Sequence, residues 1–186
     1  MTSVLTNSYM LKRAAWILVL AVASIVFSFA FTCAMPFAAL AAIGALRLRA
    51  RDAYALVGLC WLVHQIVGYG FLGYPTTWDS FAWGGVLGVS IFAATAAVIA
   101  MGQVTRNLTG LAVISAAFIT AFAVQQLTVF SATVVLPSGD AAFSASVVSM
   151  IFATNVLAFG FFYFLHIVGE RAGMVVPRVA QTASVG

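Results

Sequence analysis

The residues best suited to chemistry are neutral polar side chains placed inside otherwise apolar runs. His64 and Gln65 are neighbours deep in the run that begins near Ala53, and Asn155 interrupts another run near its middle. Imidazoles and amides inside a membrane bind ligands by hydrogen bonding, and they also hold helices together. His64 could either bind a ligand or join two helices. Asn155 lies at nearly the same depth and is its candidate partner in both cases.

The other candidate binding residues lie in the outer half of the predicted spans or in the outer loop after the third span. Trp78 and Asp79 follow the third apolar run, where Asp79 also suits the N-cap of the next helix and Trp78 suits an interfacial aromatic belt. Gln125 and Gln126 are adjacent, so only one of them can point squarely at the interior. The whole candidate substrate-binding set is Cys33, His64, Gln65, Tyr69, Trp78, Asp79, Gln125, Gln126 and Asn155. Such a set suits reversible capture of a neutral or zwitterionic organic molecule from outside.

The same inventory argues against an enzyme. Two His, two Cys and four acidic residues at scattered depths give no group of three or four metal ligands. His64 and His166 differ in depth by roughly 10 Å or more, too far for both to ligate one haem iron. There is no nucleophile–base spacing, paired carboxylate or phosphate loop. We expect no catalysis and no resident cofactor.

Composition places these residues in a membrane. The chain has 186 residues, of which 64% are hydrophobic and only 6% are charged, a balance for which a soluble fold of this size lacks the polar surface. The charges divide the chain into about six apolar runs, and a bilayer span needs roughly 20 apolar residues. The sequence therefore predicts a single all-α, multi-pass domain over residues 1–186, surrounded by membrane lipids.

The basic residues serve as topology markers. The formal charge of +4 comes from residues scattered one to three at a time, without the basic stripe that nucleic acid would need. If Lys12 is cytoplasmic, six crossings place all eight basic residues on that side and place Asp79 and Asp140 on the other. We expect both termini to be cytoplasmic, with flexible ends over residues 1–11 and 170–186.

Proline and small residues locate the helices within the apolar runs. The predicted helices cover residues 14–34, 37–48, 53–73, 81–101, 108–130 and 141–168. Pro36 ends the first helix, because proline disfavours helix at the preceding residue. The short second helix must either stop part-way or cross against protein rather than lipid. Its small residues permit close backbone approach; they are Ala38, Ala41, Ala42 and Ala45.

Two further spacings predict packing rather than chemistry. Gly84 and Gly88 are four apart in the fourth predicted helix and form a small-xxx-small face for a neighbouring helix. His166 and Glu170 are also four apart, which is typical of an ordinary pair on one helix face.

In size, six-helix topology and short second helix, the chain resembles the substrate-binding component of energy-coupling-factor vitamin transporters. The resemblance implies a protein of the bacterial inner membrane that captures a vitamin-like molecule at the outer face, with a coupling subunit and its ATPases as partners. Cobalamin-binding members direct a cysteine thiol toward cobalt, which implies Cys33, in FTCAMPFAALAA, as the cobalt ligand and Cys60 as the second choice. Buried packing is the structural alternative for Cys33.

One departure from that family bears on coupling. The family's docking patch is an Ala-xxx-Ala pattern on the first helix, whereas here Ala30-xxx-Ala34 and Ala38-xxx-Ala42 fall at its outer end or on the second helix. A solitary carrier is therefore open beside the coupled one. The competing function is a non-catalytic structural or assembly subunit of a larger membrane complex. A quinone-handling role for His64 lacks a second titratable group at that depth.

Overall fold

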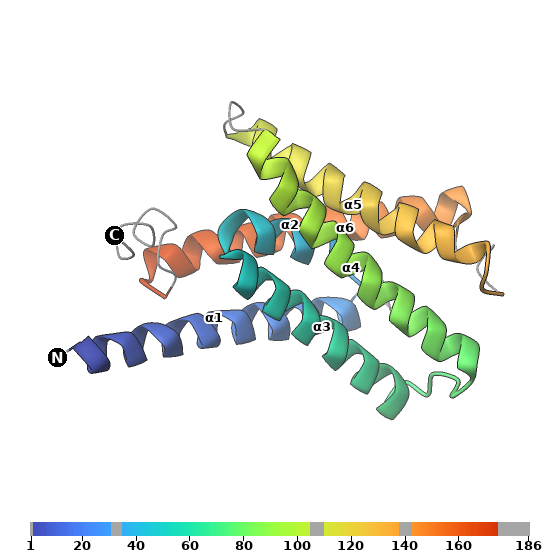
Figure 1. Cartoon of the computed structure of the whole chain (residues 1–186), viewed down its shortest axis with the longest axis horizontal. Helices are drawn as coiled ribbons and strands as arrows, with labels where there is room; N and C mark the ends of the chain where they lie inside the picture. The colour runs from blue at the N-terminus through green and yellow to red at the C-terminus, as the bar shows by residue number, and fades with distance from the viewer. Residues whose placement is uncertain (1, 31–34, 105–109, 138–142, 175–186) are drawn as a thin grey trace.

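A computed structural model describes residues 2–30, 35–104, 110–137 and 143–174, which form a bundle of six α-helices (Figure 1). In chain order the helices are α1 (Thr2–Ala30), α2 (Phe37–Arg47), α3 (Ala50–Gly70), α4 (Trp78–Val104), α5 (Leu111–Thr133) and α6 (Ala145–Arg171). The described residues contain no strand. The prediction of an all-α bundle with a short second helix is confirmed.

Four of these helices are long and apolar enough to cross a membrane. They are α3, α4 as far as Gly102, α5 and α6, and between 22% and 39% of the residues in their apolar windows are buried inside the protein. Most residues in these apolar windows are therefore not fully buried, which leaves apolar surface on the outside of the bundle, as membrane spans have. α1 contributes a shorter apolar segment, Ala14–Val26.

The short helix α2 occupies the middle of the bundle. It contacts α3, α4, α5 and α6 (Figure 1). Every residue from Phe37 to Ala45 is buried. A helix that is apolar all round belongs in a core, and the many alanines let four neighbours approach it closely. Eleven residues span about 16 Å, which is about half of a hydrocarbon core of ~30 Å.

α2 begins deep inside the bundle, where Asn155 of α6 holds its first turn. The Asn155 Oδ1 atom accepts a hydrogen bond from the Ala39 N–H at 3.2 Å. Its Nδ2 atom donates to the Ile151 carbonyl at 2.9 Å and to the Met35 carbonyl at 3.5 Å. Asn155 lies about ten residues, or about 15 Å, from the start of α6, so α2 starts near mid-depth.

α2 ends where the basic residues gather. The Arg47 guanidinium carbon lies 4.9 Å from the centre of the Tyr163 ring of α6, a cation–π distance. Lys12 Nζ donates to the Gly173 carbonyl at 3.5 Å, and Arg171 stands in the last turn of α6. We call this end of the bundle the basic end. The α3–α4 connection, residues 71–77, lies at the other end of α3, which we call the loop end.

Helix boundaries differ from the predicted ones. α1 begins at Thr2, twelve residues before its predicted start at residue 14. Neither Pro nor Gly interrupts that segment, and a helix that has begun extends at one hydrogen bond per residue. α3 and α4 each begin three residues before their predicted starts, at Ala50 and Trp78. Apolar content locates a span, whereas local capping sets its ends.

Replacing Asn155 by leucine tests its role at the start of α2. Asn155→Leu leaves the Ala39 N–H and two carbonyls without their side-chain partner, and an unsatisfied buried polar group costs about 1–3 kcal/mol. We expect the free energy of unfolding, measured by denaturing-detergent titration in mixed micelles, to fall by that amount. Val156→Leu, at the exposed neighbouring position, is the control and should leave it unchanged. Equal stability of the two variants would contradict the capping role.

Candidate functional site

Large side chains of α3 pack against small residues of α4. The α3 residues recur at every fourth position and therefore share one helix face, and α4 presents its small residues at the same spacing. The facing pairs are Trp61 with Gly88, Gln65 with Gly84 and Tyr69 with Ser80. The predicted packing face of the fourth helix is confirmed, and its partner is α3.

Hydrogen bonds fix this seam between α3 and α4. Trp61 Nε1–H donates to the Gly84 carbonyl at 2.8 Å, and the hydroxyls of Tyr69 and Ser80 are 3.1 Å apart. A Cβ atom added at Gly88 would lie 2.9 Å from the Trp61 ring, closer than packed carbon atoms approach. The seam holds α3 rigidly, so the side chains on the neighbouring face of α3 are held in place too.

His64 lies on that neighbouring face of α3, near the loop end, and is only 6% exposed. Gln65 Nε2 lies 3.4 Å from His64 Nδ1. His64 Nε2 lies 3.3 Å from the Tyr74 hydroxyl oxygen. When the Gln65 amide donates to Nδ1, the proton of the neutral ring sits on Nε2, and Nε2–H donates to Tyr74. Phe37, the first residue of α2, meets the imidazole edge-on with ring centres 5.8 Å apart.

Tyr74 belongs to the loop between α3 and α4, which folds back onto α3. The Tyr74 N–H donates to the Gly68 carbonyl at 3.0 Å, and the Tyr74 ring lies so close to Gly68 that a Cβ atom there would collide with it. The loop therefore covers His64 from the loop end, while α2 covers it from the interior. His64 is a buried imidazole with a loop side chain as its cover.

The first turn of α2 gives this region its electrostatic character. A helix carries partial positive charge at its N-terminus and partial negative charge at its C-terminus. In α2 the C-terminal end is matched by Arg47, but no acidic residue stands in the first turn. The positive end of α2 therefore lies at mid-depth beside His64 without a matching carboxylate in that turn.

The two glutamines of α5 differ as the sequence predicts. Gln125 is buried and Gln126 is half-buried, so one of the pair points into the protein. The Gln125 Oε1 atom has no hydrogen-bond partner among the described residues. A buried acceptor without a hydrogen bond costs free energy. Gln125 is therefore a second polar group that could accept a hydrogen bond from a ligand.

Among the described residues, no hydrogen bond joins Asn155 to His64. All three of its hydrogen bonds go to backbone groups, of Met35, Ala39 and Ile151, whereas His64 bonds to the side chains of Tyr74 and Gln65. The Asn155 side chain thus serves the fold.

Trp78 and Asp79, at the loop end, do not form part of the site around His64. Trp78 is 68% exposed. Asp79 lies inside the first turn of α4, because α4 begins at Trp78 and the Phe81 N–H bonds to the Thr77 carbonyl at 3.1 Å. The prediction that Asp79 is the N-cap was wrong. Its carboxylate bonds the Thr77 side chain and suits the positive end of the helix.

Only one of the two cysteines lies within the described residues. Cys33 lies outside the described residues. Cys60 is buried at the middle of α3, one turn before His64, and its thiol hydrogen-bonds with Ser24 of α1. Cys60 therefore contributes to packing between α1 and α3.

The candidate residues predicted from the sequence did not include Tyr74, so its contact with His64 was missed. The available signal was Gly68, one turn after His64, where a missing side chain leaves room for another group. What the sequence lacked was the path of the loop that returns Tyr74 to that place.

The pair at the basic end is confirmed. His166 Nε2 lies 3.2 Å from a Glu170 carboxylate oxygen, and the Trp16 ring packs edge-on against His166 with centres 6.0 Å apart. Trp16 also fills the space beside Gly169. These contacts dock α1 on α6.

Neither a metal cluster nor a known relative guides the interpretation of the loop-end site. Within residues 2–30, 35–104, 110–137 and 143–174, no three His, Cys, Asp or Glu side chains gather to hold a metal ion. Comparisons with protein-family models, curated proteins and solved structures gave no match to this chain. The features that define the loop-end site are therefore the positions of His64, Tyr74 and the N-terminus of α2.

Two neighbouring glycines of α4 test the seam that positions α3. Gly88→Ala forces a Cβ atom to within 2.9 Å of the Trp61 ring, whereas Gly85→Ala meets nothing within 4 Å. We expect Gly88→Ala to lower the free energy of unfolding by about 1–3 kcal/mol. Gly85→Ala should be neutral or should raise it by up to about 1 kcal/mol, because alanine favours helix. Denaturing-detergent titration measures the free energy of unfolding of both variants. A larger loss in Gly85→Ala than in Gly88→Ala would contradict the close packing of Trp61 on Gly88.

Proposed function

We propose that this protein captures a small organic solute at the loop end of the bundle and mediates its uptake across the membrane. The observation that carries the proposal is the N-terminus of α2, which lies at mid-depth beside His64 with no acidic residue in its first turn. Helix ends inside a membrane are costly unless they are buried in protein or line a site. Broken helices that point an N-terminus at a substrate are a recurring device of membrane carriers.

His64 can replace its hydrogen bonds to Tyr74 and Gln65 by hydrogen bonds to a ligand. Tyr74 comes from a loop and Gln65 from a flexible side chain, so both can move without unwinding a helix. Displacing Tyr74 would uncover the Nε2–H of His64. Asn155 has no such freedom, since its partners are backbone groups.

These groups define the chemistry of the solute. The His64 Nε2–H and the α2 N-terminus both favour a hydrogen-bond acceptor with negative charge, such as a carboxylate or phosphate. Tyr69 and Tyr74, with ring centres 5.8 Å apart, offer aromatic faces to a ring-containing molecule. A vitamin fits this description. Cobalamin is the first to test, because the family resemblance implies Cys33 as a cobalt ligand.

The charge distribution gives the direction of capture. Basic residues of membrane proteins concentrate on the cytoplasmic side, and Lys12, Arg47 and Arg171 lie at the basic end. The loop end then faces outward, and both ends of the chain face the cytoplasm. In a bacterium this membrane is the inner one, and a coupling subunit with ATPases would supply the energy if the carrier does not act alone.

A specific observation favours a second candidate, a structural or assembly subunit. Trp61, Tyr69 and Asn155 all use their polar atoms in bonds within the chain, as polar groups do when they only join helices. Under this alternative no small molecule binds, and stable protein partners accompany the chain on purification.

Two variants at the site separate the proposals. Tyr74→Phe removes the hydroxyl that competes for His64 and keeps the ring on Gly68. We expect it to tighten solute binding by about two- to tenfold, the equivalent of one hydrogen bond, whereas His64→Ala should weaken binding. Tyr163→Phe, under Arg47 at the basic end, is the control and should leave binding unchanged.

The measurement starts with protein purified in mild detergent from cells grown with cobalamin. Visible absorption detects a corrin, mass spectrometry identifies any other bound solute, and titration of each variant gives its affinity. Weaker binding by Tyr74→Phe would show that Tyr74 holds the solute rather than competing with it, and would overturn the cover role. A preparation without solute that carries co-purifying subunits would favour the assembly subunit.

A further inference from the structure

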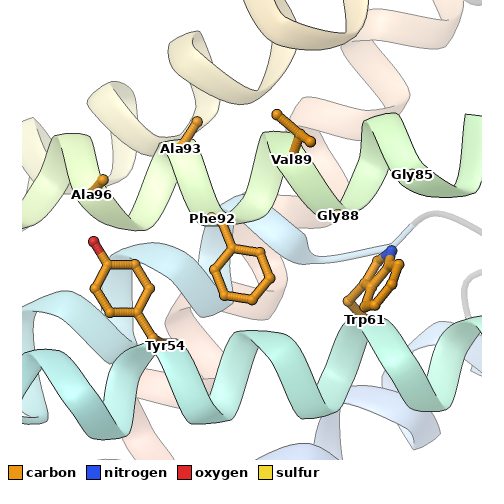
Figure 2. A pocket seen from close by; sticks show the side chains of 8 residues that line it. All are labelled: Tyr54, Trp61, Gly85, Gly88, Val89, Phe92, Ala93 and Ala96. Atoms are coloured by element: carbon orange, nitrogen blue, oxygen red, sulfur yellow. The ribbon is translucent and has the colours of Figure 1, made fainter.

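An apolar groove opens on the outer surface of the bundle along the seam between α3 and α4. Its volume is about 630 Å³, within the range of small-molecule sites. The groove is lined by Tyr54, Trp61, Gly85, Gly88, Val89, Phe92, Ala93 and Ala96 (Figure 2). Phe92 points from α4 toward α3 between Tyr54 and Trp61 and forms the floor (Figure 2), while Val89 is 62% exposed at the rim. This groove is separate from the buried His64 site.

The groove has the length of one membrane leaflet. Its α4 lining runs from Gly85 to Ala96, eleven positions or about 16 Å of helix. Half of a hydrocarbon core of ~30 Å is about 15 Å. On α3, Tyr54 lies nearer the basic end and Trp61 nearer the middle of the helix. Along α3 the groove therefore lies in the half nearer the basic end, while its α4 lining is centred on the middle of α4.

Arg51 stands just beyond the basic end of this groove. It is exposed in the first turn of α3, three positions before Tyr54. At 100° per residue Arg51, Tyr54 and Gly58 lie on one stripe of the helix, and a Cβ atom at Gly58 would touch Phe92 of the floor at 3.1 Å. The stripe thus places a guanidinium at the mouth of an apolar channel.

We propose that this groove binds an anionic phospholipid, with one acyl chain along the channel and the phosphate on Arg51. An acyl chain matches the apolar lining and the one-leaflet length. A phosphate matches Arg51, because guanidinium groups bind phosphate oxygens in a bidentate way, and anionic headgroups attract basic residues at the membrane surface.

The shape of the groove favours an acyl chain over a partner helix. α3 and α4 touch along the floor, at Trp61 with Gly88 and at Gly58 with Phe92, so the groove is shallow and open to the outside. A single acyl chain can lie along such a groove, whereas a helix about 10–12 Å wide with its side chains would contact mainly its rim. The only polar atom of Trp61 is already bonded to Gly84, which leaves little to specify a protein partner.

The test is a lipid titration of the delipidated full chain in detergent, read by native mass spectrometry. Phosphatidylglycerol is the anionic probe and phosphatidylcholine the zwitterionic one. We expect phosphatidylglycerol to bind more tightly, and Arg51→Gln to reduce its affinity about fivefold, the equivalent of about one basic residue at the membrane surface. Arg171→Gln removes an exposed charge at the same end and should change nothing.

A second pair of variants tests the contribution of the groove to lipid binding separately from that of Arg51. Ala96→Phe fills the groove beside Tyr54 and should abolish the tight phosphatidylglycerol adduct. Ala123→Phe adds the same ring at an exposed position of α5, away from the groove, and should retain it. Equal binding of the two lipids, retention of the adduct in Ala96→Phe, or equal effects of the two arginine variants would overturn the proposal. So would a second protein chain occupying the groove in place of lipid.

Discussion

The hydrogen bond from the Ala39 N–H to Asn155 allows a helix to begin in the middle of the membrane-spanning bundle. In hydrocarbon, no water is present to satisfy backbone groups at a helix end. The Asn155 side chain satisfies one amide of α2 and also bonds the carbonyls of Met35 and Ile151. With that end secured, α2 is buried from Phe37 to Ala45. The positions of α3, α4, α5 and α6 follow, because each of them contacts α2.

A helix that stops half-way gives the bundle two unlike halves. Toward the basic end α2 fills the interior, and its last turn carries Arg47, which packs on Tyr163. Toward the loop end the interior lies ahead of the positive end of α2. There Tyr74 and Phe37 contact His64, and the proposed solute capture depends on this arrangement. The seam between α3 and α4 keeps His64 in register with α2.

Much of this fold could be predicted from the sequence, because membrane helices are marked by uncharged length. Pro36 and the alanines after it were enough to predict a short buried helix, and the glycine spacing of Gly84 and Gly88 predicted a packing face that the structure confirms. The paired glutamines also behaved as their adjacency requires. These features depend on local spacing, which a sequence displays directly.

The details of the site could not be predicted, because they depend on contacts between distant segments. Asn155 looked equally suited to a ligand or a helix partner, and its role depends on meeting a residue 116 positions away. Tyr74 reaches His64 only because its loop turns back on Gly68. The mistaken N-cap at Asp79 and the late start predicted for the first helix arose because apolar content does not mark where a helix begins.

The most direct test of this account is to measure which helices touch lipid. The full chain, reconstituted in bilayers that contain a phospholipid with a carbene-forming group on its acyl chain, is irradiated, and adducts are mapped by peptide mass spectrometry. The account predicts adducts on α5 at Ile119 and Leu127, which are 52% and 63% exposed, and none on residues 37–45. Adducts on residues 37–45 at a density equal to that on α5 would contradict it, because α2 would then face lipid.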